Sequence, residues 1–333
     1  MDKKRLNACL LLTVSALIWG IASPVIKFTL SQIKPFTFLF YRFLLTLIIF
    51  LPPMVVIAKR EKETFSSLLK IAPLGFLGVG LTLTLVFLGI EKTSALDSAV
   101  LAAISPIFIC VAGVFFLKEE ISRREMVGIG LAMAGTLVTI VQPFLDGKAF
   151  ASQNLIGNLI LVASDLTWTA YVIFSKEEFK KHSPFVICAT SFIVSFFAII
   201  PFALLEQGSG LFQVRELVFE SGAFWGILYM SLFSSVIAYL GFELGLKLIE
   251  ASEATLFAYL QPLFAAPVAV AWLGEKISTP FVVGILFITV GIIMAEYRPK
   301  CRRKKQPNSC HEGTKMLKLG NEIKNSSRVV SAS

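Results

Sequence analysis

The sequence predicts an all-α integral membrane protein with ten transmembrane helices, arranged as two inverted repeats of five helices each. Of its 333 residues, 56% are hydrophobic and only 16% are charged, and the mean hydropathy is +0.77. Soluble domains carry about 25% charged residues, so this chain lacks the polar side chains that a water-facing exterior requires. The composition therefore excludes a soluble globular enzyme. Ten long apolar stretches and a repeat between the two halves of the chain complete the prediction.

Ten apolar stretches reach or approach the length needed to cross a membrane. A helix needs about 20 mostly apolar residues to span a hydrocarbon core of about 30 Å. Short segments that carry charges or turn residues separate these stretches. In chain order, we expect the transmembrane helices at Ala8–Phe28, Thr37–Ala58, Ile71–Ile90, Ala95–Leu117, Met126–Phe144, Leu155–Phe174, Pro184–Leu205, Phe224–Leu246, Ala254–Leu273 and Pro280–Glu296.

The distribution of Lys and Arg predicts the orientation of the helices. If the N-terminus is cytoplasmic, 24 of the 31 Lys and Arg residues fall on the cytoplasmic side, which is the side that the positive-inside rule favours. Ten of them follow Glu296, so the net positive charge belongs mainly to the tail and does not indicate a nucleic-acid-binding body. We expect a multi-pass plasma-membrane protein (the inner membrane, in a bacterium) with both termini in the cytoplasm.

The two halves of the chain repeat each other. Residues 95–135 align without a gap to residues 251–291, at an offset of 156, and the first helices of each half align at an offset of 149. The identical pairs include Ser15/Ser164, Trp19/Trp168, Pro106/Pro262, Glu119/Glu275, Gly128/Gly284 and Gly135/Gly291. We therefore expect a first repeat at residues 8–144 and a second at 155–296. Residues 297–333 would form a basic cytoplasmic tail without fixed structure.

Each repeat holds five predicted helices, an odd number, so the second repeat must cross the membrane in the opposite sense to the first. Many secondary transporters are built from inverted repeats that rock around a central site. Two interchangeable halves give outward-open and inward-open states of similar energy. The repeat therefore favours transport over other functions of a membrane protein.

A set of residues spread along both halves also resembles a known family. They comprise Ala16–Gly20, Pro24, Arg42, Pro106, Glu119, Gly128 and Gly135 in the first repeat, and Gly157, Trp168, Tyr171, Tyr239, Pro262, Glu275, Gly284 and Gly291 in the second. In their order along the chain they resemble the drug/metabolite transporter superfamily, specifically its proteins with two EamA domains. The resemblance covers residues 8–296. It implies a ten-helix bundle with a central cavity for small metabolites, amino acids or toxic organic compounds, which many members export.

Asp165 and a pair of tryptophans are the first candidates for a binding site. Asp165 lies near the middle of the sixth predicted span, and its repeat partner is Ala16, so the fold does not require an acid there. Ionisable groups inside a bilayer are costly and are functional candidates by default. The carboxylate either binds a proton or substrate in the cavity, or is a buried acid satisfied by hydroxyls or a basic partner. Trp19 and Trp168 either form the walls of an aromatic cavity or pack at the repeat interface.

Glu243 and Arg42 are further charged candidates. Glu243 lies between Gly241 and Gly245 toward the cytoplasmic end of the eighth span, where it either lines the cavity or, as we expect, reaches interfacial water. The superfamily usually carries an amide or an aromatic residue near this place. Arg42 lies in the outer part of the second span and either binds an anionic group of the substrate or, as we expect, forms an ion pair or snorkels to the headgroups. We expect Lys27 to snorkel as well.

Two prolines mark interruptions in the fourth and ninth helices. Pro106 and Pro262 remove a hydrogen bond from the helical ladder and kink it. The freed carbonyl groups either face a cavity or the kink only shapes the packing. Tyr259 and Gln261 would add hydrogen-bonding groups at the second kink.

Charged residues also mark the helix ends. Asp97 and Glu253 open the fourth and ninth spans, where acids offset the helix dipole, and we expect both to cap these helices. Glu119 and Glu275 end the same spans on opposite membrane faces, and we expect them to brace the structure by reaching the first turn of the next helix. The basic run Arg298–Lys305 is expected to attract anionic lipids.

These observations favour a secondary transporter that exports a small organic metabolite, amino-acid-like or amphipathic, by alternating access between the two repeats. A nucleotide-sugar or sugar-phosphate carrier is an alternative, and it would need several basic groups in the cavity. A membrane scaffold or receptor without flux is an alternative from another class. The sequence has no Walker-type loop for ATP and no paired acidic motif for a lipid enzyme, so we predict no catalytic residue, metal or cofactor. The expected partner is the solute, and protons are a candidate coupling ion. No nucleic acid is expected to bind, and a homodimer is one option for the assembly.

Overall fold

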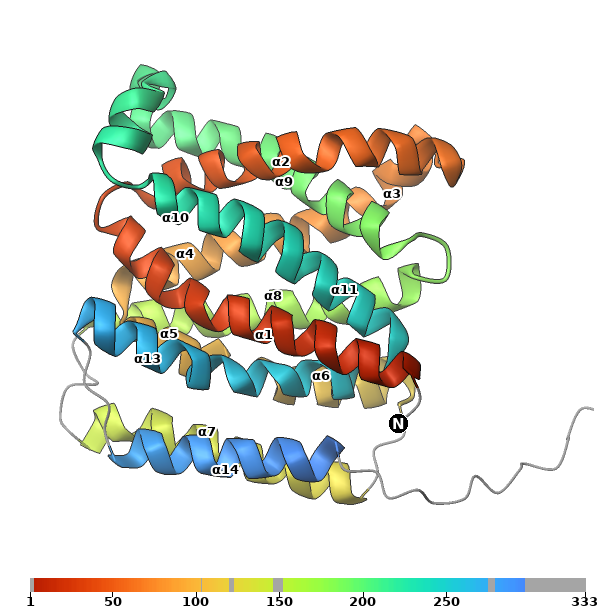
Figure 1. Ribbon diagram of the computed structural model, residues 1–333, viewed down its shortest axis with the longest axis vertical. Coiled ribbons are helices and arrows are strands. Elements are labelled where there is room, and N and C mark those ends of the chain that lie inside the picture. Colours follow the sequence, from red (N-terminus) through yellow and green to blue (C-terminus); the bar gives the residue numbers. More distant parts are fainter. Residues whose placement is uncertain (1–2, 103, 120–122, 146–151, 275–278, 297–333) are drawn as a thin grey trace, which may run out of the picture. The chain divides into compact units, whose positions relative to one another are not determined.

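The computed structural model describes residues 3–102, 104–119, 123–145, 152–274 and 279–296, and every regular element within them is a helix (Figure 1). In this part of the chain, seven helical segments are long and apolar enough to cross a membrane. Three shorter apolar helices, at Ser105–Leu117, Met126–Gly135 and Val282–Gly291, accompany them. The fold is that of an all-α membrane protein, as the composition predicts.

The first repeat contains nine described elements, which correspond to its five predicted spans. Proline begins α2, where its missing N–H would have no helical partner, and the Thr64 side chain caps α3 by accepting from the Ser67 N–H at 3.2 Å. The described elements are α1 (Lys3–Leu30), α2 (Pro35–Arg60), α3 (Phe65–Gly75), η1 (Phe76–Leu81), α4 (Thr82–Lys92), α5 (Ala95–Ala102), α6 (Ser105–Ala112), η2 (Gly113–Leu117) and α7 (Arg123–Leu145).

The second repeat follows the same plan with a longer connection before its third span. Pro184 begins α9, and Ser183 caps that helix. The elements are α8 (Ser152–Glu178), α9 (Pro184–Gln207), η3 (Gly208–Phe212), η4 (Arg215–Glu220), α10 (Phe224–Tyr229), η5 (Met230–Ala238), α11 (Tyr239–Leu248), α12 (Ala251–Thr255), η6 (Leu256–Leu260), α13 (Gln261–Leu273) and α14 (Thr279–Glu296).

The third and eighth spans are not regular α-helices throughout. Each contains a π-helical stretch, η1 and η5, and the two stretches occupy equivalent places in the repeats. Thr82 and Ser235 donate from their hydroxyl groups to backbone carbonyls five residues earlier, at 2.8 and 2.9 Å. We expected one continuous α-helix in each place. π-helical turns occur often at functional sites. Met230 and Ser234 of η5 line the cavity described below, and so does Thr82, which directly follows η1.

The helices α7 and α14 pack antiparallel through glycine residues. A Cβ atom on Gly135 would lie 2.5 Å from the Gly284 carbonyl oxygen, and a Cβ atom on Gly291 would lie 2.5 Å from the Gly128 carbonyl oxygen. Gly291 is the repeat equivalent of Gly135, and Gly128 is that of Gly284, so each contact is the repeat equivalent of the other. The contacts therefore follow the pseudo-two-fold relation that inverted repeats require.

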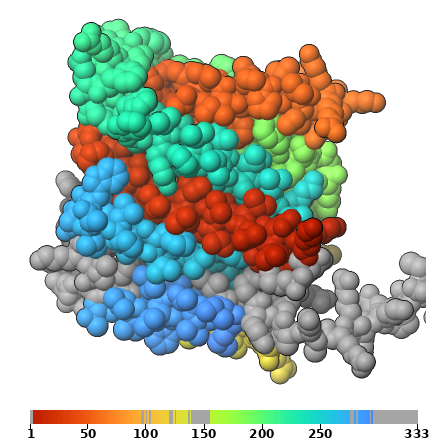
Figure 2. All heavy atoms as spheres, in the orientation of Figure 1, coloured from red at the N-terminus to blue at the C-terminus, as the bar shows by residue number. Residues whose placement is uncertain are grey.

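Other helix pairs follow the same relation. The helices α2 and α9, which are repeat equivalents, pack against each other. The helix α4 packs against α8, and their repeat equivalents α11 and α1 pack against each other in the same way. On the face shown in Figure 2, α1 lies between α11 and α13. Leu12 of α1 covers Gly245, and its repeat equivalent Leu161 covers Gly89. Small residues thus let helices of opposite repeats approach closely, as is common in membranes.

The glycine contacts predict how substitutions in α7 affect stability. We expect Gly135→Ala to destabilise the protein by about 1–3 kcal/mol, because its methyl group would collide with backbone atoms of α14 that have no free space to move. Thermal unfolding of the purified protein in detergent measures this effect. Gly130→Ala on the same helix is the control, since its methyl group would meet nothing within 4 Å. Equal unfolding temperatures for the two variants would contradict the prediction.

Candidate functional site

A cavity of about 150 Å³ lies among helices of both repeats. On α1 its lining residues recur every three or four positions, at Leu12, Ser15, Trp19, Ala22 and Ile26, so a single face of this helix borders the cavity. The other lining residues belong to α2, α4, α5, α6, α8, η5, α11, α12, η6 and α13. The cavity is therefore central to the described bundle.

The walls of the cavity come largely from repeat-related pairs of residues. The pairs that line it are Leu12/Leu161, Ser15/Ser164, Ala16/Asp165, Trp19/Trp168, Leu83/Tyr239, Val86/Phe242, Ser98/Ala254, Ala102/Ala258 and Ser105/Gln261. Most pairs are identical or similar, but Asp165, Tyr239 and Gln261 each correspond to a smaller or less polar residue in the other repeat. The fold is thus nearly symmetric around the cavity, and its polar chemistry is not.

Asp165 lies on α8 and lines the cavity. Only 6% of the residue is exposed, and its buried Oδ2 atom accepts no hydrogen bond. None of the ion pairs among the described residues involves this carboxylate. The group is therefore available to a cation or a hydrogen-bond donor that enters the cavity.

Arg42 lies on α2 and also lines the cavity, although it is fully buried. Its Nε donates to Ser235 Oγ at 2.9 Å, its Nη2 donates to Ser234 Oγ at 3.3 Å, and its Nη1 has no partner. The guanidinium carbon lies 5.5 Å from the centroid of the Phe87 ring, a cation–π distance. We expected snorkelling or an ion pair, but neither occurs in the described part of the chain, because two serines of η5 hold the guanidinium inside the bundle.

Aromatic rings from three spans gather at the cavity. The Trp19 and Trp168 rings meet edge to face at 5.7 Å, and the Tyr239 ring lies 5.1 Å from Trp19. The Phe242 ring lies 5.2 Å from Trp168. The tryptophans thus both line the cavity and pack against each other across the repeat boundary. Edge-to-face aromatic pairs contribute about 0.5–1.5 kcal/mol beyond their burial.

The two prolines begin helices next to the cavity. Pro106 and Pro262 each occupy the first turn of a helix, α6 and α13, and the 3-10 helix η6 directly precedes α13. The residues before them, Ser105 and Gln261, line the cavity. Tyr259 does not line it; the residue is 1% exposed and its hydroxyl group is buried without a partner.

Glu243 lies inside the protein rather than at its edge. The residue is 0% exposed, and its Oε1 accepts a hydrogen bond from the Tyr171 hydroxyl at 2.5 Å. Its Oε2 atom is buried without a partner. The expected position in interfacial water is therefore wrong, because the side chain projects from α11 toward α8 and not toward the membrane surface.

Two glutamates close the ends of helices that belong to the other repeat. The Glu119 carboxylate accepts from the backbone N–H groups of Ala251 and Ser252 at 2.7 and 3.0 Å, at the start of α12. Glu206 accepts in the same way from Thr37 at the start of α2, at 2.7 Å. Because the first N–H groups of a helix lack internal partners, these contacts satisfy them. Glu119 thus reaches the first turn of a helix, but not that of the next helix in the chain.

Two lysines close the opposite ends of helices in the same manner. Lys27 donates to the carbonyl groups of Ile90 and Glu91 at 2.9 and 3.1 Å, where α4 ends. Its repeat equivalent Lys176 donates to the carbonyls of Leu246 and Ile249, where α11 ends. Lys27 therefore caps a helix instead of snorkelling to the headgroups. Comparison of the two repeats could have revealed this pair, since both positions carry Lys.

The remaining expectations concern helix ends and the tail. Glu253 in the first turn of α12 is buried and pairs with Arg5, with 3.3 Å between Oε2 and Nη2. The Asp97 side chain, Glu275 and Arg298–Lys305 lie outside the described residues. Within the described part, no group of three or more His, Cys, Asp or Glu side chains is arranged to hold a metal ion.

Sequence reasoning missed several residues that line the cavity or hold one of its lining residues in place. Tyr239 and Phe242 complete the aromatic cluster, and Ser234 and Ser235 hold Arg42. Serines in an apolar span give little indication of their partner when it lies 193 positions away in the chain. Both serines lie in η5, the repeat equivalent of η1. This position would have indicated their role only to a reader who already knew of the π-helical turns.

Together, the long apolar helices, the exchange of contacts between repeats and the central cavity define a helical membrane transporter. The EamA-like transporter family matches residues 6–141 and 155–297. The chain belongs to this family.

Individual relatives are similar over nearly their whole length. An uncharacterized transporter of Archaeoglobus fulgidus is 27% identical over 86% of this chain and 96% of its own. YyaM, an uncharacterized transporter of Bacillus subtilis, is 26% identical over 91% and 99%. A "probable amino-acid metabolite efflux pump" of Salmonella typhimurium is 25% identical over 86% and 93%. A crystal structure of a protein that is 16% identical shares the fold, with a TM-score of 0.70 over 87% of this chain and 96% of that one.

The Glu119 contact predicts a loss of stability on truncation. We expect Glu119→Ala to destabilise the protein by about 1–3 kcal/mol, because two backbone N–H groups at the start of α12 would lose their acceptors. Glu119→Gln keeps one acceptor oxygen and should lose less. Thermal unfolding in detergent gives the comparison, with Glu61→Ala at an exposed position as the control. A Glu119→Ala variant as stable as the control would show that the contact is unimportant.

Proposed function

We propose that this protein exports a small amino-acid-like metabolite, which binds in the central cavity and is released after the two repeats rearrange. The observation that carries the proposal is the presence of one acidic and one basic side chain in the same cavity, each without an ionic partner. Asp165 can accept an ammonium group, and Arg42 can donate to a carboxylate through its unpartnered Nη1. A zwitterion satisfies both.

The rest of the cavity fits this class of substrate. Its walls combine aromatic rings with the hydroxyl groups of Ser15, Ser98 and Ser164, so an apolar or weakly polar side chain finds a surface to contact. Small-molecule sites are usually apolar with a few well-placed polar groups. The printed name of the Salmonella relative, an amino-acid metabolite efflux pump, supports the same class and the outward direction.

The alternative of a nucleotide-sugar or sugar-phosphate carrier has weaker support. A diphosphate needs several cations or many N–H donors around it. Among the described residues that line the cavity, Arg42 is the sole Lys or Arg. A carboxylate such as Asp165 in the same cavity would also repel a phosphate.

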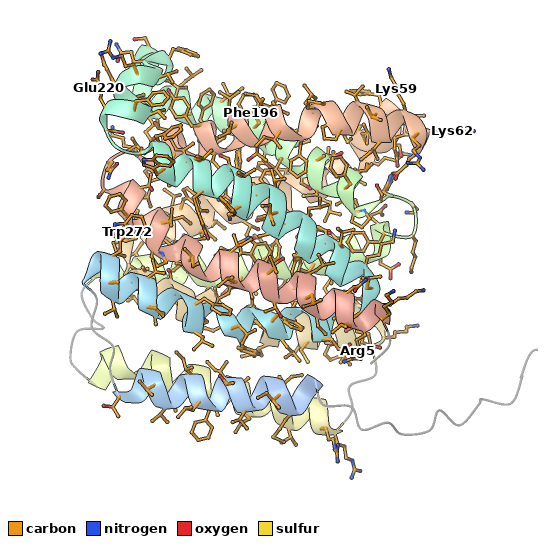
Figure 3. The ribbon with its side chains drawn as sticks, viewed as in Figure 1. Arg5, Lys59, Lys62, Phe196, Glu220 and Trp272 are labelled. Atoms are coloured by element: carbon orange, nitrogen blue, oxygen red, sulfur yellow. The ribbon has the colours of Figure 1, made fainter. Side chains whose placement is uncertain are left out.

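The proposed orientation places both termini in the cytoplasm. Arg5, Lys59 and Lys62 lie at one end of the helices, and Glu220 and Trp272 lie at the other (Figure 3). Clustered basic residues favour the cytoplasmic side. With this orientation, Glu119 closes the start of α12 on the cytoplasmic side.

Substitution of the two charged residues tests the proposed site. We expect Asp165→Asn and Arg42→Gln each to reduce amino-acid flux about 10- to 100-fold, because a hydrogen bond to a charged group contributes about 1.5–3 kcal/mol and 1.4 kcal/mol corresponds to a factor of ten. The measurement is uptake and efflux in reconstituted vesicles with a panel of amino acids, nucleosides, nucleotide sugars and cationic dyes. The exposed Glu61→Gln variant serves as the control.

Three outcomes of this measurement would contradict the proposal. Selective flux of nucleotide sugars would favour the alternative carrier. Full amino-acid flux in both variants would remove Asp165 and Arg42 from the site. No flux of any solute by the unaltered protein would support a scaffold or receptor.

A second prediction separates the roles of the two charges. We expect amines that lack the carboxylate to be poor substrates of the unaltered protein, and Arg42→Lys to impair amino-acid flux while leaving amine flux unchanged. The reason is that lysine keeps the charge but loses the planar fork that binds a carboxylate. Competition of amino acids and their decarboxylated analogues for uptake measures this. Equal losses for both kinds of solute would place Arg42 outside the carboxylate site.

A further inference from the structure

Glu243 is a fully buried carboxyl group that does not belong to the cavity wall. It lies between Gly241 and Gly245, both of which face α1: Cβ atoms on them would lie 2.9 Å from Ser15 Oγ and 2.7 Å from Leu12 Cγ. Successive residues of an α-helix are rotated by about 100°, so Glu243 projects from the opposite face of α11. Tyr239 and Phe242 of the same helix line the cavity, whereas Glu243 is not among its lining residues, so a solute in the cavity does not touch the Glu243 carboxyl group.

The surroundings of Glu243 contain no counter-ion. The titratable groups that face it are Tyr171 of α8, Cys188 of α9 and Tyr239 of α11 itself. No ion pair among the described residues includes Glu243. Arg42 interacts with Tyr239, and its two serine partners hold it on the cavity side.

This environment favours the neutral carboxyl group in the conformation seen here. An ionised carboxylate with one hydrogen bond and no counter-ion is costly inside a protein or a bilayer. Leaving one neutral oxygen of Glu243 unpaired costs far less than leaving a charge unpaired. Glu243 is therefore a site that holds a proton where no substrate can reach.

A thin aromatic layer separates this site from the cavity. The Trp168 and Phe242 rings line the cavity, and the Tyr171 ring lies 5.4 Å from that of Trp168. The layer excludes a metabolite, whereas a proton needs only a hydroxyl group or a water molecule as its carrier. Tyr171, whose hydroxyl group donates to Glu243, stands at this boundary.

The same tyrosine lies on the boundary between the repeats. A Cβ atom on Gly78 would lie 2.0 Å from the Tyr171 ring, so the π-helical stretch η1 of the first repeat packs directly on this ring of the second. Movement of the third span along α8 must therefore change how the Tyr171 ring is covered. A change at Tyr171 is transmitted to Glu243 by their hydrogen bond.

We propose that Glu243 is the proton-binding group of this transporter, occupied in the present conformation, and that rearrangement of the repeats exposes it so that its proton passes to water. The inference rests on the proposed function, because it assigns the coupling step of the same transport cycle. Asp165 then contacts the substrate, and the two acids have separate tasks. Tyr171 is a positioning residue that holds the carboxyl group away from the cavity.

The test separates coupling from substrate exchange. Glu243→Gln is reconstituted in vesicles with a radiolabelled amino-acid mixture, and two fluxes are measured: exchange without a pH gradient and accumulation driven by one. We expect exchange to stay within twofold of the unaltered protein and gradient-driven accumulation to fall at least tenfold. Glu243→Asp, which keeps an acid, should retain gradient-driven accumulation with a shifted pH dependence, and Tyr171→Phe should shift that pH dependence too. Full gradient-driven accumulation in Glu243→Gln would overturn the proposal.

A measurement without substrate keeps this test independent of the proposed function. The infrared band of a protonated carboxyl group is recorded as a function of pH for the unaltered protein, Glu243→Gln and Asp165→Asn. We expect Glu243→Gln to remove a band that Asp165→Asn leaves in place at neutral pH. If no amino acid is transported but this band behaves as expected, the proposed substrate is wrong and the proton site stands. If the band is unchanged in Glu243→Gln, the proton site is wrong.

Discussion

Two copies of one five-helix unit must fit against each other in opposite orientations, and close contacts at small residues decide how they fit. Gly135 and Gly291 bring α7 and α14 within backbone contact of each other, and Gly89 and Gly245 receive leucines from the other repeat. Lipid tails offer no hydrophobic driving force between helices, so such close packing has to hold them together. Leu12 and Leu161, which cover two of these glycines, also line the cavity, so the same contacts that join the halves also position its walls.

Charged side chains pair with the backbone N–H and C=O groups at helix ends, which packing alone would leave unsatisfied. Inside a bilayer, unsatisfied backbone groups cost several kcal/mol each, and this protein satisfies helix ends with side chains from distant segments. Glu119 and Glu206 serve helix starts, while Lys27 and Lys176 serve helix ends. These charges have structural tasks, which leaves Asp165, Arg42 and Glu243 as buried charged residues that the fold itself does not explain.

The sequence contains enough information for the architecture and for part of the site. Hydropathy and the repeat predict the helical membrane fold, and the intramembrane positions of Asp165 and Arg42 mark them as candidates. The burial of Glu243 could not be predicted, because its place near a helix end suggests interfacial water, and only the packing of α8 and α11 encloses it. The serine partners of Arg42 were equally hidden, since hydrophobic periodicity carries no signal for a π-helical turn. The paired lysines were detectable in principle, because the repeat alignment places Lys176 opposite Lys27.

The charge balance of the cavity has an electrical consequence. Asp165 and Arg42 are the charged side chains among the described lining residues, so their ionised forms cancel. A membrane potential exerts about 2.3 kcal/mol per 100 mV on each elementary charge that crosses it. A cavity wall without net charge, whether the cavity is empty or holds a zwitterion, moves little net charge across the membrane. The membrane potential therefore contributes little to the free energy of its reorientation. Any voltage dependence of the cycle must then come from charges that move outside the cavity wall.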